Sequence, residues 1–307
     1  MVEDLYDCIV IGAGPAGLSA SLFLARYLCK TLTFHHNSPR NEYAHGIHGF
    51  LGHDGIRPAE LLARGRDEVT SYGGLIIEAC VNSVEQVSAE CFRVSAGSEG
   101  TEPRVFNARR LLLATGLRDL TPDCPGFREF YGSSVFHCPD CDGYEVKDKR
   151  VAVLTHGKNA AGFTAHLLTW TTQLTLLTDQ REIPSRDRAA LERLNVATRT
   201  AAVAALEGDE STGQLKRVLF SEGEPLECDA LFFNLGVELA TNFHQTLGCR
   251  LDEESELVWI DKTQQTSVNG VYAAGDMTPR SQLAVVAAAE GAMAAIQIHK
   301  SLTSELV

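Results

Sequence analysis

The sequence lacks any uninterrupted run of about 18 apolar residues, so we expect no helix that spans a membrane. Basic residues are also scarce, because 27 Lys and Arg stand against 40 Asp and Glu, which gives a formal net charge of −13. The acidic excess is spread along the chain and argues against binding to nucleic acid or to anionic membranes. No signal peptide is visible, because glycines break the first apolar run, and we expect a cytoplasmic protein.

Nine cysteines are an odd number for a chain without a secretory signal, which favours a reducing compartment with one catalytic pair. Cys138 and Cys141 form the single Cys-x-x-Cys of the sequence. We interpret the scattered remainder as small apolar residues of the core. These are Cys8, Cys29, Cys80, Cys91, Cys124, Cys228 and Cys249.

The 307 residues favour two domains. The first part of the chain alternates strand and helix, the βαβ arrangement of a parallel sheet. The elements predicted there are strands over 6–11 and 31–35, helices over 18–28 and from Pro58 to Gly73-Gly74, a β-meander over 75–79, 83–88 and 92–95, and a buried strand over 110–114. A second unit repeats the layout over 151–154, 159–169 and 174–177, with two strand-like runs in 220–233 and a strand, turn and Ala-rich helix in 270–302.

A glycine-rich run, Gly12-x-Gly14-x-x-Gly17, lies between the first strand and the first helix, where a dinucleotide-binding loop is expected. Its first glycine allows a tight turn, the second lets the backbone approach a pyrophosphate, and the third lets helix and strand pack closely. The following helix then offers N–H groups and the positive end of its dipole to the phosphates. The sequence therefore predicts a nucleotide cofactor at this loop.

The acidic residue expected about 20 positions later is missing, because the sequence there reads Phe34-His35-His36-Asn37. Either a neutral imidazole or the Asn37 amide accepts the hydrogen bonds of the ribose, or these residues are surface polar groups and the ribose is held elsewhere.

A second run, Gly275-Asp276, follows an apolar strand and precedes a helix that starts near Gln282. Its carboxylate can accept hydrogen bonds from the sugar-like chain of a flavin, and the helix N-terminus can face the end of the ring where reduction builds negative charge. The alternative is an ordinary turn with an Asp cap. The glycine loop upstream favours the cofactor site.

The dithiol lies in the run His137-Cys138-Pro139-Asp140-Cys141-Asp142. Thiol–disulfide exchange needs an ionised attacking thiol and a proton for the leaving thiolate, and Asp142 and His137 are groups that can supply or accept that proton. Half of a zinc site and a purely structural pair are the alternatives, but no second Cys-x-x-Cys completes a zinc cluster. His45, His48 and His53 form a further cluster, which we interpret as part of a glycine-rich loop over a cofactor, with metal binding as the alternative.

These runs together resemble the low-molecular-weight thioredoxin reductase family over almost the whole chain. The resemblance is carried by Gly12 to Gly17, Ala114-Thr115-Gly116, Cys138-Pro139-Asp140-Cys141-Asp142-Gly143, Gly275-Asp276 and the helix from Gln282 to Ala295. It implies an α/β fold of two nucleotide-binding-type (Rossmann-like) domains with three-layer ββα architecture, the second inserted in the first. Residues 1–117 and 245–307 would form a FAD-binding domain and residues 118–244 the inserted domain, in a homodimer.

The resemblance also implies roles for single residues. Cys141 would face the flavin, Cys138 would attack the substrate disulfide, and Asp142 would be the acid/base group. The cofactor would be FAD, and the expected FAD-binding residues are Gly12, Gly14, Pro15, Ala16, Gly17, His35, His36, Arg40, Asn41, Thr115, Gly116, Gly275, Asp276, Gln282 and Leu283. No metal is expected.

The inserted domain departs from the family where NADPH should bind. The glycine-rich turn of the family is here Thr155-His156-Gly157-Lys158-Asn159-Ala160, and a Thr side chain and a His would crowd a pyrophosphate. The family's His-Arg-Arg run aligns with Thr178-Asp179-Gln180-Arg181, which puts an acid where the 2′-phosphate needs positive charge. NADPH use is therefore disfavoured, although Lys158 and Arg181 could partly compensate.

Electron donors other than NADPH are then alternatives. NADH suits an acid at that strand end, and divergent cyanobacterial and clostridial relatives, to which this chain looks similar, take electrons from ferredoxin or hold a second flavin in the vacant site. Our first hypothesis is a FAD-dependent oxidoreductase that reduces thioredoxin or another protein disulfide. A flavin-dependent dithiol oxidase that uses oxygen and a non-catalytic flavin redox sensor are the alternatives.

Overall fold

The computed structural model describes residues 5–36, 38–98 and 100–304. The chain divides into two compact units. Unit 1 takes the described residues of Met1–Glu42, Phe50–Arg118 and Leu239–Val307, and unit 2 takes Tyr43–Gly49 and Asp119–Glu238. These bounds differ from the predicted domains in three places, because residues 43–49 belong to unit 2, and Arg118 and residues 239–244 belong to unit 1.

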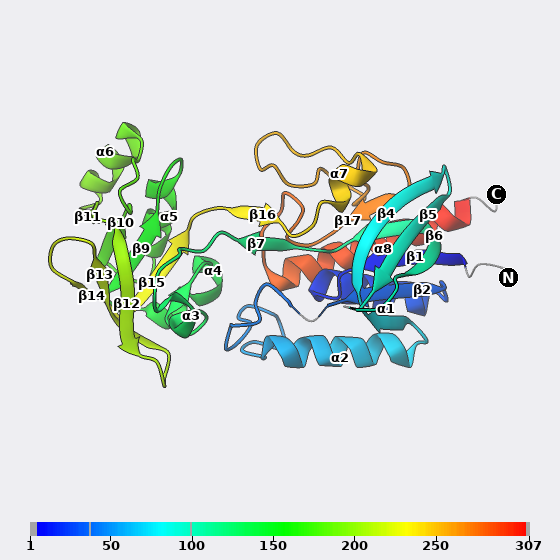
Figure 1. The fold of residues 1–307 in the computed structure, drawn as a ribbon, viewed down its shortest axis with the longest axis horizontal. Helices are drawn as coiled ribbons and strands as arrows, with labels where there is room; N and C mark the ends of the chain where they lie inside the picture. Colours follow the sequence, from blue (N-terminus) through cyan, green and yellow to red (C-terminus); the bar gives the residue numbers. More distant parts are fainter. Residues whose placement is uncertain (1–4, 37, 99, 305–307) are drawn as a thin grey trace. The chain divides into compact units, whose positions relative to one another are not determined.

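Unit 1 is built on a seven-stranded sheet in the order β3-β2-β1-β6-β5-β4, with β17 also paired to β6 (Figure 1). The long strand β6 joins two parts, since its first half pairs antiparallel with β5 and its last three residues pair parallel with β17. The strands are β1 (Leu5–Ile11), β2 (Thr31–His35), β3 (Leu75–Glu78), β4 (Cys80–Ser88), β5 (Cys91–Gly97), β6 (Arg104–Leu113) and β17 (Val271–Ala273).

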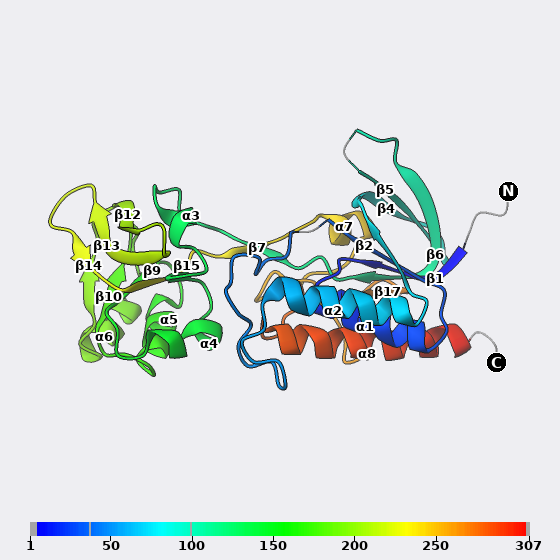
Figure 2. The same ribbon diagram turned by 90° about the horizontal axis from the view of Figure 1, so that it is seen from below.

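Three helices of unit 1 lie side by side along the sheet, as Figure 2 shows. They are α1 (Pro15–Arg26), α2 (Pro58–Ser71) and α8 (Ala284–Thr303), while the short α7 (Phe243–Leu247) lies apart from them. Small residues let α1 and α8 approach closely, because a Cβ atom at Gly291 would lie only 1.9 Å from the carbonyl oxygen of Ala16. The alanine-rich composition of α8 thus serves a tight helix–helix contact.

Unit 2 contains a parallel five-stranded sheet in the order β11-β10-β9-β15-β8 and an antiparallel sheet β12-β13-β14. The strands are β8 (Val135–Phe136), β9 (Val151–Thr155), β10 (Leu174–Leu177), β11 (Ala197–Arg199), β12 (Val203–Asp209), β13 (Gln214–Phe220), β14 (Leu226–Glu227) and β15 (Ala230–Asn234). The helices are α3 (Phe127–Phe130), α4 (Pro139–Asp142), the 3₁₀ helix η1 (Tyr144–Val146), α5 (Ala160–Leu167) and α6 (Ser185–Arg193). Strands β7 (Leu117–Asp119) and β16 (Val237–Leu239) pair with each other where the chain passes between the units.

The predicted α/β class with two Rossmann-like sheets is confirmed. Two local predictions are wrong. Strand β3 belongs to the parallel sheet beside β2 rather than to the meander, which consists of β4, β5 and β6. Cys80 is exposed rather than a core residue, because it lies on β4 at the edge of the sheet, and Cys29, Cys91 and Cys124 are only partly buried.

Candidate functional site

Three of the sequence runs meet at one edge of the unit 1 sheet. The glycine loop follows β1, Ala114-Thr115-Gly116 follows β6, and Gly275-Asp276 comes shortly after β17, all at the carboxyl ends of neighbouring parallel strands. The Thr115 hydroxyl donates to Met277 Sδ at 3.6 Å, which ties the second run to the third. Carboxyl ends of parallel strands are where open α/β sheets bind ligands.

The glycine loop has the shape that a pyrophosphate requires. A Cβ atom at Gly12 would lie 2.2 Å from the Ala114 carbonyl oxygen, and one at Gly17 would lie 1.8 Å from the Gly12 carbonyl oxygen. At Gly14, by contrast, a Cβ atom would meet nothing within 4 Å, so this face of the loop is open. Helix α1 starts at Pro15 without a side-chain cap, which leaves its first N–H groups available to phosphate oxygens.

Arg40 holds the acidic residue of the Gly275-Asp276 turn. Its Nη1 donates to Asp276 Oδ2 at 3.0 Å and to Gln282 Oε1 at 2.7 Å. Three predicted site residues from distant parts of the sequence therefore touch one another. Helix α8 then begins after Leu283 without a side-chain cap, so its N-terminus is available too.

The ribose end of the predicted site is less well defined. His35 is the half-buried last residue of β2, and His36 is exposed. Asn37, the third candidate for this role, lies outside the described residues. Asn41 is half-buried and follows Arg40 directly.

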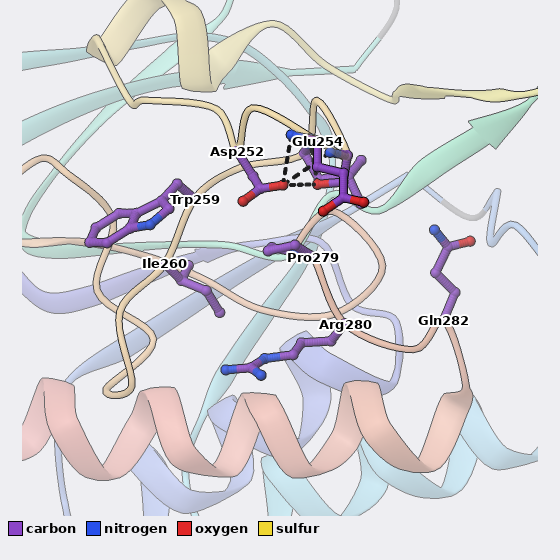
Figure 3. A pocket seen from close by; sticks show the side chains of 9 residues that line it. Asp252, Glu254, Trp259, Ile260, Pro279, Arg280 and Gln282 are labelled. Carbon is purple, nitrogen blue, oxygen red and sulfur yellow. Dashed lines mark hydrogen bonds between the residues drawn. The ribbon is translucent and has the colours of Figure 1, made fainter. Parts of the chain in front are cut away.

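A depression of about 520 Å³ lies beside the loop of residues 279–282, which follows the Gly275–Thr278 turn (Figure 3). It is lined by the hairpin that carries Asp252 and Trp259 and by the loop that carries Pro279, Arg280 and Gln282. The side chain of Asp252 is turned to its own loop, where Oδ1 accepts from the Ser255 hydroxyl at 2.8 Å. Gln282 connects this depression to Arg40 and to the turn.

In unit 2, Cys138 and Cys141 form a disulfide at the start of α4, with Cα atoms 5.3 Å apart. The backbone N–H of Cys141 donates to Cys138 Sγ at 3.1 Å. An N–H donor at a sulfur stabilises the thiolate over the thiol. This contact favours Cys138 as the ionised thiol once the disulfide is reduced.

His137 is fixed by two neighbours. Its Nδ1 lies 3.1 Å from the Tyr131 hydroxyl and 4.0 Å from Asp119 Oδ2. The Asp119 side chain is only 8% exposed. The sequence argument identified His137 but missed both Tyr131 and Asp119, because their contacts depend on how α3 and β7 pack.

Asp142, which follows Cys141 directly, has a pKa that the protein shifts toward neutrality. Burial, followed by the nearby Glu145 carboxylate, raises the pKa of Asp142 to about 7, while His48 opposes that rise. A carboxyl group with such a pKa can both give and take a proton near neutrality. His48 comes from the 43–49 segment and lies 3.6 Å from Glu145 Oε1.

The three histidines of the 45–53 run do not converge. His45 Nε2 lies 2.7 Å from the Ser133 hydroxyl, His48 pairs with Glu145, and the His53 ring contacts Phe50. Within the described ranges, no group of three or more His, Cys, Asp or Glu side chains is arranged to hold a metal ion.

The family model of pyridine nucleotide-disulphide oxidoreductases matches residues 6–291. The chain belongs to this family.

Individual members of the family match most of the chain. Thioredoxin reductase tcpT of Claviceps purpurea is 31% identical over 285 residues, covering 89% of this chain and 87% of that protein. The thioredoxin reductase of Treponema pallidum is 27% identical over 317 residues and covers 96% of each. The solved structure of an oxidoreductase from Agrobacterium tumefaciens has a TM-score of 0.87 at 30% identity and covers 98% of this chain and 99% of its own.

This disulphide oxidoreductase is accordingly a thioredoxin-reductase-like flavoprotein, as the motifs predicted, and its family implies FAD. The open face at Gly14 and the uncapped starts of α1 and α8 fit that cofactor. Of the helices in the described part of the chain, none combines the length and the apolarity that crossing a bilayer requires.

The corresponding loop of unit 2 has a different structure. The Ala161 N–H at the start of α5 donates to Asp187 Oδ2 at 3.2 Å, so a carboxylate from α6 caps this helix. The Thr155 hydroxyl donates to the Asn234 carbonyl oxygen at 2.9 Å, which turns its side chain to β15. Asp179 Oδ1 accepts from the Val203 N–H at 2.8 Å. Asp179 was expected at this site from the sequence, whereas Asp187 was not, because it comes from another helix.

Proposed function

We propose that this disulphide oxidoreductase binds FAD in unit 1 and passes two electrons through Cys138 and Cys141 to a disulfide substrate. The observation that carries the proposal is the Cys138–Cys141 disulfide in the same chain as an open, uncapped dinucleotide loop. FAD, when bound, supplies an acceptor and donor of electron pairs. We propose that the FAD-binding residues expected from the sequence, from Gly12 to Leu283, hold this cofactor.

The chain's own residues then perform the exchange. Two electrons and two protons convert the Cys138–Cys141 disulfide to two thiols. The Cys138 thiolate, stabilised by the Cys141 N–H, attacks one sulfur of the substrate disulfide and releases the other sulfur as a thiolate, which Asp142 protonates. The Cys141 thiol next gives its proton to Asp142, and the thiolate attacks Cys138 Sγ in the mixed disulfide. This breaks the bond between Cys138 and the substrate, restores the internal disulfide and releases the second substrate sulfur, which takes that proton to become a thiol.

His137 would assist as a second proton carrier. Its ring is held by Tyr131 and Asp119, so it is oriented rather than free to rotate. Fixed orientation is what a general acid or base needs near a reacting sulfur.

We further propose that NADPH is a poor electron donor for this enzyme. Three observations support weak binding in unit 2. Asp187 caps α5 where a pyrophosphate would need N–H groups, Asp179 adds negative charge at the end of β10, and His156 adds a bulky side chain to the turn. NADH, reduced ferredoxin or a second flavin would then take the place of NADPH.

The substrate we propose is thioredoxin or another protein disulfide, because tcpT and the Treponema pallidum protein are named thioredoxin reductases. A homodimer in the cytoplasm is the expected assembly. An acidic ferredoxin would have to dock at a local basic patch, since the overall charge of −13 repels it.

An anaerobic titration tests both proposals. Purified protein reconstituted with FAD is titrated with NADPH, NADH and reduced ferredoxin in turn, while the flavin absorption is followed. We expect slow or partial bleaching with NADPH, and rapid stoichiometric bleaching by it would contradict weak binding. Protein that takes up no FAD would contradict the proposed function altogether.

Thioredoxin reduction by the flavin-reduced enzyme is the second measurement. Cys138→Ser should abolish it, and Cys91→Ser, a thiol on β5 outside the dithiol, should leave it unchanged. Oxygen consumption driven by a small dithiol, without thioredoxin reduction, would instead identify a dithiol oxidase.

A further inference from the structure

We propose that Glu290 is a positioning residue for the flavin, because its buried carboxyl group fixes the Gly275–Thr278 turn on helix α8. This inference rests on the proposed binding of FAD in unit 1. Glu290 lies in an alanine-rich stretch of α8 and is 4% exposed. A buried carboxyl group is costly unless the surrounding atoms use it, so its contacts indicate its task.

One carboxyl oxygen closes the turn. Glu290 Oε2 accepts from the Gly275 backbone N–H at 2.8 Å and from the Thr278 hydroxyl at 2.8 Å. The Thr278 hydroxyl also contacts the Gly275 carbonyl oxygen at 3.0 Å. The turn that carries Asp276 is therefore held by Glu290 at Gly275 and Thr278 and by Arg40 at Asp276.

The neighbouring residue locks the same stretch of α8 against the glycine loop. Gly291 packs on the carbonyl oxygen of Ala16 in the first turn of α1, with no room for a side chain. Gly275 itself faces Ala16, since a Cβ atom there would lie 2.9 Å from the Ala16 Cβ. Glu290 and Gly291 thus fix the spacing between the run that would hold the pyrophosphate of FAD and the run that would hold the adjoining sugar-like chain.

The other carboxyl oxygen faces the buried side chain of Gln264. Among the described residues, Glu290 Oε1 and Gln264 Oε1 are both buried without a hydrogen-bond partner. Either a proton on Glu290 or a Gln264 amide turned to present its Nε2 gives Glu290 Oε1 a hydrogen-bond partner. Burial raises the pKa of Glu290, while the hydrogen bonds from Thr278 and Gly275, the charge of Arg280 and a hydrogen bond from Gln264 oppose that rise.

Arg280 is a weak counterion for the ionised form. Its Nε lies 3.8 Å from Glu290 Oε1, and its side chain is 56% exposed. In Figure 3 this side chain lies over helix α8 at the margin of the depression. An ion pair at this distance whose cation is largely in solvent contributes little.

The test compares Glu290→Gln and Glu290→Ala with a control on the same helix, Met293→Ala, whose side chain is 44% exposed. The dissociation constant of FAD is measured by fluorescence, and the absorption and circular dichroism spectra of bound flavin are recorded at saturating FAD. Glutamine can accept from Gly275 and Thr278 and donate to Gln264, as the neutral acid would, so it should bind FAD within about threefold of the parent with the same spectra. Alanine should weaken FAD binding roughly tenfold or more and change the spectra.

Alanine binding within threefold of the parent, or glutamine failing as badly as alanine, would overturn the proposal. If the alanine variant does not fold, Thr278→Val removes one of the same hydrogen bonds and should weaken FAD binding severalfold, and unchanged binding in that variant would overturn the proposal as well. A parent protein that binds no FAD would instead contradict the proposed function, which separates the two failures.

Discussion

Asp187 Oδ2 accepts a hydrogen bond from the Ala161 N–H at 3.2 Å, whereas the equivalent helix start of unit 1, at Pro15, has no side-chain cap. The two Rossmann-like halves therefore differ where a dinucleotide would place its phosphates. A carboxylate at a helix N-terminus occupies the N–H groups and the dipole that a phosphate would use. Each half is thus suited to a different ligand, and the difference can be measured.

Replacing Asp187 by alanine should tighten the binding of NADPH to unit 2. The substitution frees the Ala161 N–H and removes a negative charge, an effect of about 0.3–1 kcal/mol, or roughly two- to fivefold in the dissociation constant. Glu192→Ala, which removes an exposed acid from the same helix α6, is the matched control and should change little. Unchanged NADPH binding in Asp187→Ala, measured by equilibrium titration, would show that the cap does not limit access.

Asp179 should affect both the stability of unit 2, through its hydrogen bond, and the binding of NADPH, through its charge. Two variants separate these effects. Asp179→Ala leaves the Val203 N–H without its acceptor and should lower the free energy of unfolding by about 1 kcal/mol. Asp179→Asn keeps an oxygen for that N–H but removes the charge, so it should unfold like the parent in urea while binding NADPH more tightly. If Asp179→Asn binds NADPH no better than the parent, the charge at this strand end is not what disfavours the cofactor.

The sequence predicted the nucleotide units well because their strands are short, buried and followed by glycine turns. β2 and β10 have the predicted bounds to within a residue, and the three runs at the unit 1 sheet edge meet as parallel topology requires. β3 was expected in the antiparallel meander although it pairs parallel with β2. A half-buried strand shows the same residue pattern in parallel and in antiparallel pairing, so the sequence could not distinguish the two. Strands β8, β11 and β12 were missed, since very short or partly exposed strands carry little apolar pattern.

The supporting residues of the site were harder to predict, because they depend on tertiary contacts between distant segments. Arg40 was expected near the cofactor, but its bond to Asp276 spans 236 positions. Asp187, Tyr131 and Asp119 carry no local pattern at all. Glu290 did carry one, since a glutamate between Ala289 and Gly291 on an apolar helix face is unusual, yet that run served only to mark the family's closing helix.

The raised pKa of Asp142 predicts a pH dependence for both stability and exchange. The folded-state pKa of about 7 lies above the ordinary value of 3.8, so the protonated form is favoured by folding, and the stability this provides at low pH is lost as the pH rises toward 7. The pH window of this effect is the interval between the two pKa values, ~3 pH units wide. Between about pH 4 and pH 7, the melting temperature of Asp142→Asn should therefore fall less than the melting temperature of the parent.

The rate of thiol–disulfide exchange should also show an inflection near pH 7 in the parent that disappears in Asp142→Asn. Asp140→Asn, an exposed neighbour paired with His166, serves as the control and should keep the inflection. An inflection that persists in Asp142→Asn would assign the titration to another group, and His137 would be the next to replace.

Tyr131→Phe should slow disulfide exchange severalfold without unfolding the protein. The substitution removes the hydroxyl that holds His137 Nδ1 but keeps the ring that packs on Phe127 and Phe233. Tyr144→Phe removes a hydroxyl from a side chain that is 74% exposed and should have no effect. Equal rates for the two variants would mean that His137 needs no fixed orientation.

The two cysteines should be distinguishable by trapping. If Cys138 is the attacking thiol, Cys141→Ser leaves it able to attack a substrate disulfide but unable to resolve the product, so a mixed disulfide should accumulate. Cys138→Ser lacks the sulfur that the Cys141 N–H stabilises and should form much less adduct under the same conditions. Mass spectrometry after reaction with a disulfide reagent and with oxidised thioredoxin measures the adduct directly. Preferential trapping on Cys141 in the Cys138→Ser protein would reverse the assigned roles and leave the N–H contact without a catalytic consequence.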